Sequence, residues 1–206
     1  MSASPAAYIV DDDRSIRDSL SLWLGIRGVR CLGYESAEGF LAVVQPDWRG
    51  CVLVDLQLDG MDGLQLQAQL AERKIAMPVI FVTGHGDVGT ARNALKAGAF
   101  DFIEKPLDND RLVELVGAAM AKDAADAQRQ AQAALLAERL QRLTQREREV
   151  MAQVVAGRHN REIAADLGIS PRTVEVYKAR LMDKLDVQRV ADLVKLALEA
   201  QVESRH

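Results

Sequence analysis

Acidic, hydroxyl and basic side chains follow four separate apolar runs in the first half of the chain. A carboxylate can act as a nucleophile and become an aspartyl phosphate. Hard oxygen ligands suit Mg²⁺, which is typically held by one or two carboxylates together with phosphate oxygens. A lysine ammonium supplies a compact positive charge for a phosphoryl group. The residues that predict such a phosphoryl-accepting site are Asp11, Asp12, Asp55, Thr83 and Lys105.

Asp55 is the central candidate among these residues. It follows the apolar run 51–54, which lacks polar alternation and therefore predicts a short strand buried on both faces, as in parallel sheets. Ligands of open α/β sheets bind outside the carboxyl ends of the strands. Taken alone, Asp55 is better interpreted as a turn residue or helix N-cap. Because the other strand ends also carry residue types suited to phosphoryl chemistry, we favour a functional role for Asp55.

The loop after Asp55 also resembles the start of a calcium-binding EF-hand loop, with Gln57, Asp59 and Gly60 at its early positions. That loop requires a bidentate glutamate at its twelfth position. Leu66 stands there, and a predicted strand precedes the loop where a helix is needed. We therefore reject a calcium site.

The elements that must position these side chains can be predicted from apolar periodicity. Five predicted strands cover residues 8–10, 29–34, 51–55, 79–82 and 100–104, and five predicted helices cover 15–24, 37–44, 64–72, 90–97 and 110–121. Strands and helices alternate, and the connections are short enough for right-handed βαβ crossovers. This half is therefore predicted as an α/β domain with a doubly wound, five-stranded parallel sheet.

The composition is that of one large or two small globular domains, with 206 residues of which 49% are hydrophobic and 27% charged. No apolar run approaches the roughly 20 residues that span a bilayer, and the first residues lack a signal-peptide pattern. We expect a cytoplasmic protein with no membrane partner. Cys31 and Cys51 stand in apolar settings and are predicted to be reduced packing residues.

Charge is distributed unevenly along the chain, with a net charge of −6 over residues 1–120 and +1 over each of 121–143 and 144–206. This asymmetry predicts domains with different partners. We divide the chain into a first domain at 1–121, a helical linker at 122–143 and a second domain at 144–206. The linker lacks Pro and Gly and is rich in helix-forming Ala, Gln and Arg. It is either a coiled coil that makes dimer contacts or a solvated spacer helix.

The last 63 residues are predicted to form an all-α domain of four helices. Thr144 and Glu147 have capping-box spacing before the first helix, and Ser170-Pro171 supply an N-cap and a first-turn proline before the third. The second and third helices, at 160–167 and 171–185, are joined by a short turn with Gly168, which is the helix-turn-helix pattern. The cationic bias of the third helix is mild and also fits an ordinary solvated helix.

Residues 6–120 resemble a response-regulator receiver domain, which has a flavodoxin-like fold. The resemblance implies that Asp55 is the phosphoacceptor and that Thr83 and Phe102 are switch residues. It also implies a Mg²⁺ site and a cis peptide bond after Lys105. The matching motifs are Val10-Asp11-Asp12, Val54-Asp55, Val82-Thr83-Gly84 and Lys105-Pro106, and the implied Mg²⁺ ligands are Asp12, Asp55 and the Gln57 carbonyl, with Asp11 acting through water.

The chain departs from this receiver pattern at one position beside the site. Leu58-Asp59 stand where the family usually has Met-Pro before glycine. Asp59 adds an acidic group and removes the rigidity of proline. The departure affects how strongly the site is expected to bind Mg²⁺, whereas the acceptor role of Asp55 does not depend on it.

Residues 140–203 resemble the LuxR/NarL-type DNA-binding domain, and the whole chain resembles regulators of the FixJ type. The resemblance rests on residues 143–147, 160–164 and 170–176, together with 83–88 and 102–106. It implies a third helix that lies in the major groove of DNA. The base-facing positions are then Glu175, Val176 and Ala179, and the phosphate contacts are Arg172, Thr173, Lys178 and Lys184.

We therefore expect a transcription factor that a sensor histidine kinase phosphorylates on Asp55 and that binds double-stranded promoter DNA as a homodimer, with RNA polymerase as a further partner. It is not expected to be an enzyme beyond phosphoryl acceptance and slow autodephosphorylation. Unlike charges suited to a two-fold dimer face are Arg92, Lys96, Asp101 and Arg111.

Two alternatives belong to other classes of protein. A haloacid-dehalogenase-like phosphatase also uses an aspartate nucleophile at a strand end, but it needs a second acid where Gln57 stands. A protein-binding adaptor could use the helix-turn-helix for another protein rather than for DNA.

Overall fold

The computed structural model describes residues 4–84, 95, 96 and 98–203, with side chains through residue 198. The chain divides into two compact units, Met1–Ala127 and Gln128–His206. The predicted linker at 122–143 does not stand apart from them, because most of it belongs to one helix, α5 (Asn109–Gln141), which begins in the first unit. The domain boundaries at 121 and 143 therefore stay predictions.

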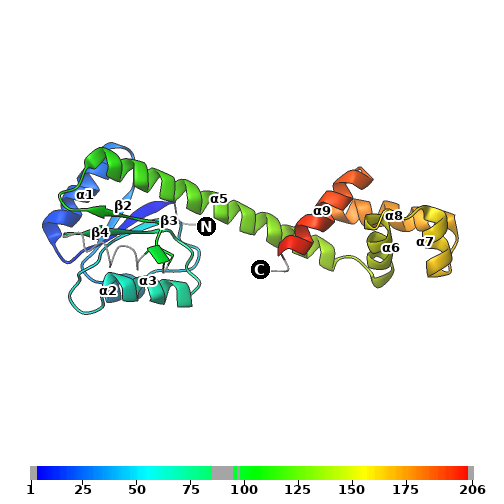
Figure 1. Ribbon diagram of the computed structural model, residues 1–206, viewed down its shortest axis with the longest axis horizontal. Coiled ribbons are helices and arrows are strands. Elements are labelled where there is room, and N and C mark those ends of the chain that lie inside the picture. The colour runs from blue at the N-terminus through cyan, green and yellow to red at the C-terminus, as the bar shows by residue number, and fades with distance from the viewer. Residues whose placement is uncertain (1–3, 85–94, 97, 204–206) are drawn as a thin grey trace. The chain divides into compact units, whose positions relative to one another are not determined.

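The first unit contains the predicted five-stranded parallel sheet, with the strand order β2-β1-β3-β4-β5 (Figure 1). Val10 of β1 pairs with Val54 of β3, and Asp55 pairs with Val82 of β4. The carboxyl ends of the central strands therefore meet at one edge of the sheet. The strands are β1 (Ala6–Val10), β2 (Cys31–Tyr34), β3 (Gly50–Asp55), β4 (Val79–Thr83) and β5 (Asp101–Glu104).

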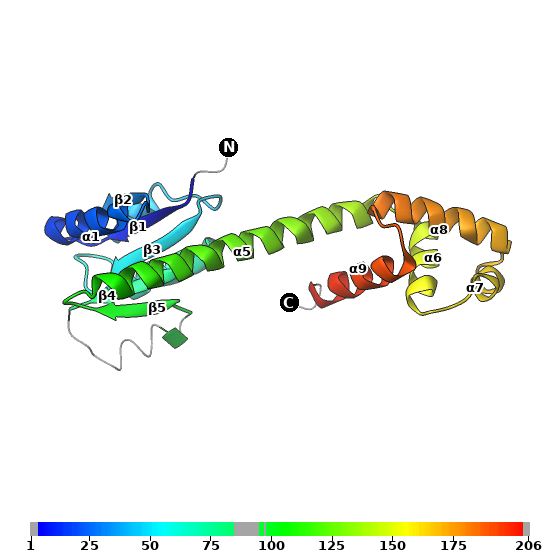
Figure 2. The same cartoon turned by 90° about the horizontal axis from the view of Figure 1, so that it is seen from above.

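Helices cover both faces of this sheet, which confirms the doubly wound arrangement. One face is covered by α1 (Arg14–Ile26) and α5, and the other by α2 (Ala37–Leu41) and α3 (Gly63–Glu72) (Figures 1 and 2). Alternation along the strands divides the core accordingly. Ile9 packs with the α1 and α5 side, whereas Tyr8 packs with Phe40 and Leu66 on the other.

Two predicted helices of this unit need comment. The helix predicted at 37–44 ends at Leu41, and its next residues form a turn before Pro46, which cannot continue a helix. The helix predicted at 90–97 lies outside the described residues except for Leu95 and Lys96, which are helical. Both β2 and β5 begin slightly later than predicted.

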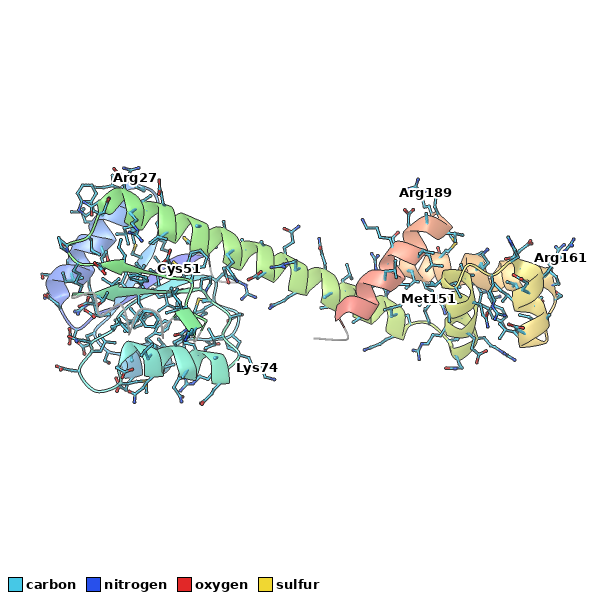
Figure 3. The ribbon with its side chains drawn as sticks, viewed as in Figure 1. Arg27, Cys51, Lys74, Met151, Arg161 and Arg189 are labelled. Atoms are coloured by element: carbon cyan, nitrogen blue, oxygen red, sulfur yellow. The ribbon has the colours of Figure 1, made fainter. Side chains whose placement is uncertain are left out.

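Neither cysteine forms a disulfide in the described structure. Cys31 and Cys51 pair with Ala7 from opposite sides, so two strand spacings, roughly 10 Å, separate them. A disulfide requires Cα atoms less than about 7 Å apart. Cys51 lies in the interior of the sheet (Figure 3), and burial raises the pKa of its thiol to about 12.

The second unit has the predicted four helices, α6 (Gln145–Val155), α7 (Asn160–Leu167), α8 (Pro171–Leu185) and α9 (Val190–Glu203). The Thr144 side chain accepts a hydrogen bond from the Glu147 backbone in a capping box, and Ser170 caps α8 by accepting one from the Thr173 N–H. The core of the unit contains fully buried side chains from α6 to α9, namely Val150, Ile163, Val174, Leu181, Leu185 and Leu193.

Within the part of the chain that the structure describes, no helix is long and apolar enough to cross a membrane.

Candidate functional site

The predicted polar residues of three strands converge at the carboxyl edge of the sheet. The Lys105 ammonium Nζ lies 2.6 Å from Asp55 Oδ2 and 3.0 Å from Asp11 Oδ2. Asp11 and Asp55 are 2% and 9% exposed. Asp55 and Asp11 are 50 and 94 positions from Lys105 along the chain, so the parallel sheet alone brings them together.

Backbone amides fix the direction in which the two carboxylates point. The N–H of Gln57 donates to Asp55 Oδ1 at 2.9 Å, and the N–H of Asp13 donates to Asp11 Oδ1 at 2.9 Å. Each carboxylate therefore has one oxygen held by the loop after its strand and the other directed at the shared ammonium. This is a preorganised acidic site rather than a set of surface charges.

The charges in this site are unbalanced, since one ammonium contacts two carboxylates. Burial raises the pKa of Asp11, although hydrogen bonds from Lys105 and the Asp13 N–H oppose that change. Burial alone would lower the pKa of Lys105, but its hydrogen bonds to Asp55 and Asp11 raise it. Lys105 is therefore charged at neutral pH, and the remaining negative charge favours a cation at this edge.

Residues of β4 and β5 adjoin the acidic site. Thr83 ends β4 and is 7% exposed, and its carbonyl accepts a hydrogen bond from the Lys105 N–H at 2.7 Å. The Lys105–Pro106 peptide bond is cis, as the receiver resemblance implied. Phe102 is half-buried and packs against the core on the α2 and α3 side. The two predicted switch residues therefore lie near Lys105, Thr83 at the end of the neighbouring strand β4 and Phe102 on β5 itself.

The chemistry of the donor set fits Mg²⁺, because the side chains supply hard carboxylate oxygens with incomplete charge compensation. Among the described residues, no three acidic, histidine or cysteine side chains form a ready metal cluster. Between the carboxylates of Asp11 and Asp55 lies the Lys105 ammonium, 3.0 and 2.6 Å from them. Asp12 and Gln57 are exposed beside them.

In the second unit, the solvent face of α8 carries most of the predicted DNA contacts. Arg172, Glu175, Val176 and Ala179 are exposed, and Val176 is 44% exposed. Thr173 and Lys178 are half-buried. One face of α8 is thus committed to the core through Val174, Leu181 and Leu185, while the predicted base-facing positions remain on the other.

Lys178 links the two helices of the helix-turn-helix. Its ammonium donates to Asn160 Oδ1 of α7 at 3.1 Å, which holds it beside the first turn of that helix. The exposed Arg161 follows at the surface of α7 (Figure 3). A cation fixed near a helix N-terminus suits a phosphate oxygen.

The predicted dimer face is only partly described. Lys96 and Arg111 are exposed. Asp101 is half-buried, and its Oδ1 accepts a hydrogen bond from the Phe102 N–H at 2.8 Å. Arg92 lies outside the described residues, so this set stays a prediction.

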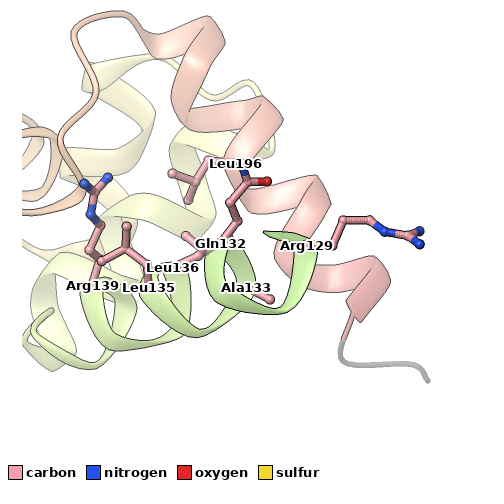
Figure 4. Close-up of a pocket in the computed structure, with 7 residues that line it drawn as sticks. All are labelled: Arg129, Gln132, Ala133, Leu135, Leu136, Arg139 and Leu196. Carbon is pink, nitrogen blue, oxygen red and sulfur yellow. The ribbon is translucent and has the colours of Figure 1, made fainter. Parts of the chain in front are cut away.

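A cavity of about 490 Å³ in the second unit lies between the end of α5 and α9 (Figure 4). Its walls contain no carboxylate or hydroxyl group, so it cannot perform the chemistry of the sheet edge. The lining residues are Arg129, Gln132, Ala133, Leu135, Leu136, Arg139 and Leu196.

Comparison with known families agrees with both halves of this description. Residues 7–117 match the response regulator receiver domain, and residues 141–197 match the luxR family of bacterial regulatory proteins. This chain is a response regulator. It joins a receiver to a luxR-type DNA-binding domain and is a transcriptional regulator of the FixJ type.

Relatives of this response regulator match it over nearly their whole lengths. The transcriptional regulatory protein FixJ of Azorhizobium caulinodans is 40% identical over 98% of this chain and 96% of its own, and that of Rhizobium meliloti is 44% identical over 93% and 94%. The solved structure of the response regulator StyR is 34% identical, covers 96% of this chain and 100% of its own, and has a TM-score of 0.89. Full-length FixJ from B. japonicum is 36% identical, covers 97% and 98%, and has a TM-score of 0.59. These relatives do not favour the phosphatase or adaptor alternatives.

One positioning residue of the response regulator was not predicted. Arg17 of α1 donates from Nη1 to the carbonyls of Asp11 and Asp12, at 2.7 and 3.0 Å. It thereby holds the backbone of Asp11 and Asp12. The only sequence signal was an arginine in the first turn of the helix that follows the acids.

Asp59 also contacts Asp12. Its N–H lies 3.4 Å from Asp12 Oδ2. A proline has no N–H to donate, so the departure from the family pattern adds a contact as well as a charge.

Lys184, a predicted phosphate contact, has partners within its own domain. Its ammonium lies 2.7 Å from Glu147 Oε2 and 3.2 Å from the Arg142 carbonyl. Glu147 is only 3% exposed. Lys184 therefore neutralises a buried carboxylate and ties α8 to the capping box of α6. Its contact with a DNA phosphate stays a prediction.

Proposed function

We propose that this response regulator accepts a phosphoryl group on Asp55 from a sensor histidine kinase, and that phosphorylation promotes dimerisation and binding to double-stranded promoter DNA. The observation that supports this most strongly is the Lys105 ammonium between the Asp55 and Asp11 carboxylates, 2.6 and 3.0 Å away. We further propose that the protein acts in the cytoplasm and that RNA polymerase is another partner.

The phosphoryl transfer is a displacement at phosphorus. An Asp55 oxygen forms the new P–O bond while the P–N bond to the kinase histidine breaks, and the histidine nitrogen leaves with the electron pair and takes a proton from water. Lys105, already directed at Asp55 Oδ2, then pairs with a phosphoryl oxygen. Attack of water on the phosphorus of the acyl phosphate would release inorganic phosphate and return the free carboxylate, which is the proposed slow autodephosphorylation.

Mg²⁺ would be held by Asp12, Asp55 and the Gln57 carbonyl, with Asp11 acting through water. When bound, it supplies positive charge to the phosphoryl oxygens. Arg17 orients the backbone of Asp11 and Asp12, because its guanidinium donates hydrogen bonds to both of their carbonyls. The Thr83 hydroxyl is proposed to donate a hydrogen bond to a phosphoryl oxygen, and the Phe102 ring to move when Thr83 moves.

Labelling with acetyl phosphate and Mg²⁺ tests the acceptor. Asp55→Asn should abolish labelling, because a carboxamide is a poor nucleophile and cannot form an acyl phosphate. Asp47→Asn is the matched control, since it neutralises an exposed acid in the loop before β3, away from the predicted Mg²⁺ ligands. Equal labelling of wild type and Asp55→Asn would place the acceptor elsewhere, with residues 11–13 the first to examine.

A further inference from the structure

Asp123 is a buried carboxylate that the proposed phosphoryl chemistry does not use. It lies on α5 and is 4% exposed. Its Oδ2 accepts a hydrogen bond from the backbone N–H of Gly50 at 2.9 Å. Gly50 is the first residue of β3, and Asp55 is the last. A helix carboxylate therefore holds one end of the strand that carries the phosphoacceptor at its other end.

The donor of this hydrogen bond is fixed by the sheet. Gly50 pairs with Ala6 of β1 and has φ = +127°, and a Cβ at this position would lie 1.8 Å from the Ala6 carbonyl oxygen. Only glycine fits such a close backbone approach. The Ala6 N–H also donates to the Arg49 carbonyl at 3.1 Å. Asp123 is thus attached to the sheet itself and not to a loop.

Asp123 extends the contact of α5 with the receiver beyond the apolar packing. The helix residues that pack on the sheet include Leu112, Val116 and Ala119 and end with Met120. Asp123 follows one turn later. The next charged pair, Lys122 Nζ to Asp126 Oδ2 at 2.6 Å, lies within the helix, so that pair does not attach it to the sheet.

The choice of a carboxylate here is costly for stability. Burial raises the pKa of Asp123, although the Gly50 N–H and the charge of Arg49 oppose that change. An asparagine oxygen could accept the same hydrogen bond without a buried charge. Groups that cost stability and hold a defined geometry are candidates for specifying position.

We propose that Asp123 is the positioning residue that fixes residues 120–127 of α5 to β3, so that a change at Asp55 is passed along β3 to the start of the linker. Transmission along β3 rests on the proposed phosphorylation of Asp55. The attachment itself does not, because it is a property of the unphosphorylated protein.

Hydrogen exchange of the full-length, unphosphorylated protein tests the attachment. In Asp123→Ala the Gly50 amide and the amides of 120–127 should exchange at least about tenfold faster, because the buried N–H loses its partner and the helix loses its tie. Asp123→Asn should stay within about threefold of wild type, since its amide oxygen still accepts the bond. Glu114→Ala, at an exposed carboxylate of the same helix, is the control. A folded Asp123→Ala protein with wild-type exchange at both places would overturn the attachment.

Labelling and DNA binding of the same variants test transmission. Asp123→Ala should label on Asp55 at the wild-type rate with acetyl phosphate and Mg²⁺, yet lose most of the increase in DNA affinity that labelling produces. A full increase in Asp123→Ala would overturn transmission along β3. Failure of the wild type to label would instead overturn the proposed function, while the exchange result would still decide the attachment.

Discussion

Lys105 is the residue on which the receiver site depends, because its single charge contacts both Asp55 and Asp11. In the free protein it offsets carboxylate repulsion. In the phosphorylated protein it is proposed to bind the phosphoryl group instead. The same ammonium would therefore have different partners in the two proposed states, which is what a switch requires.

Replacing Lys105 by alanine separates these roles. Lys105→Ala should keep part of the labelling at Asp55, because the nucleophile and the predicted Mg²⁺ ligands remain. It should lose most of the increase in dimerisation that labelling produces, since the ammonium no longer links the phosphoryl group to the end of β5. Sedimentation with and without phosphoryl donor measures this, with Lys122→Ala as the control on α5. Normal dimerisation of Lys105→Ala would reduce Lys105 to a structural charge.

Lys178 and Lys184 are both lysines of α8, and they have different partners in the structure, Asn160 and Glu147. Lys184→Met should lower the free energy of unfolding by about 1–3 kcal/mol, because Glu147 is left buried without its cation. Lys178→Met should instead weaken DNA binding on all sequences and lower the salt slope by about one. Thermal melts and DNA titrations at several salt concentrations distinguish the two. A Lys184→Met protein with unchanged melting and a reduced salt slope would restore Lys184 to the DNA contacts.

The Glu147 interaction also has a defined pH dependence. Burial alone would raise the pKa of Glu147, but the hydrogen bonds from Lys184 and the Thr144 N–H lower it overall. A lowered pKa in the folded state stabilises the protein at pH values above the unfolded pKa, and this contribution is lost as the pH falls through the folded pKa. The stability difference between wild type and Lys184→Met should therefore be largest near neutral pH and shrink below about pH 4.

Among the helices, α8 divides its side chains between the domain core and the solvent. Val174 is fully buried, whereas Val176, two residues later, is 44% exposed. This separation follows from the helical repeat, because neighbours two apart point to opposite sides. The two valines therefore form a matched pair for testing the recognition helix.

Truncating each valine should produce a different defect. Val176→Ala should change the preference at one base pair by roughly 1–3 kcal/mol, since a valine methyl can contact a thymine methyl in the major groove. Val174→Ala should lower the free energy of unfolding by about 1–3 kcal/mol and leave base preference unchanged. Binding-site selection and chemical denaturation measure the two effects. Unchanged base preference in Val176→Ala would remove this residue from direct readout.

For the protein as a whole, the proposed change of state is from a monomer to a dimer on phosphorylation. Lys96 and Arg111 are exposed, and Asp101 is half-buried on β5 between them in sequence. Exposed ion pairs contribute only about 0–1 kcal/mol each. They would therefore set the register of a two-fold interface, while apolar contacts would supply most of the affinity.

Charge reversal at Asp101 tests this interface. Asp101→Lys should sharply reduce dimerisation of the labelled protein, because it places like charges opposite Lys96 or Arg111, while labelling of Asp55 continues. Asp18→Lys reverses an exposed charge on α1 and is the control. Sedimentation of each protein with and without phosphoryl donor gives the result. If labelled Asp101→Lys dimerises as tightly as wild type, the linker helix becomes the next candidate interface.

Features that depend on local pattern could be predicted from the amino-acid sequence. Short unbroken apolar runs, separated by predicted helices, predicted the parallel sheet. A parallel sheet places its carboxyl ends on one edge, so Asp55 and Lys105 could be assigned to one site from their strands alone. The helix starts at Thr144 and Ser170 were also predicted, because capping involves residues only three apart.

Polar partners that are distant along the chain follow only from the way the elements pack. The contacts of Asp123 with Gly50 and of Lys184 with Glu147 join residues 73 and 37 positions apart. Their local sequences look like ordinary solvated helix surface, so the pairing of Lys184 with a buried acid could not be predicted from them. Arg17 is close to its partners in sequence, but its role depends on how the loop after β1 turns its carbonyls. The physical reason is the same in each case: a side chain's partner is set by burial and by the packing of elements, which local periodicity does not encode.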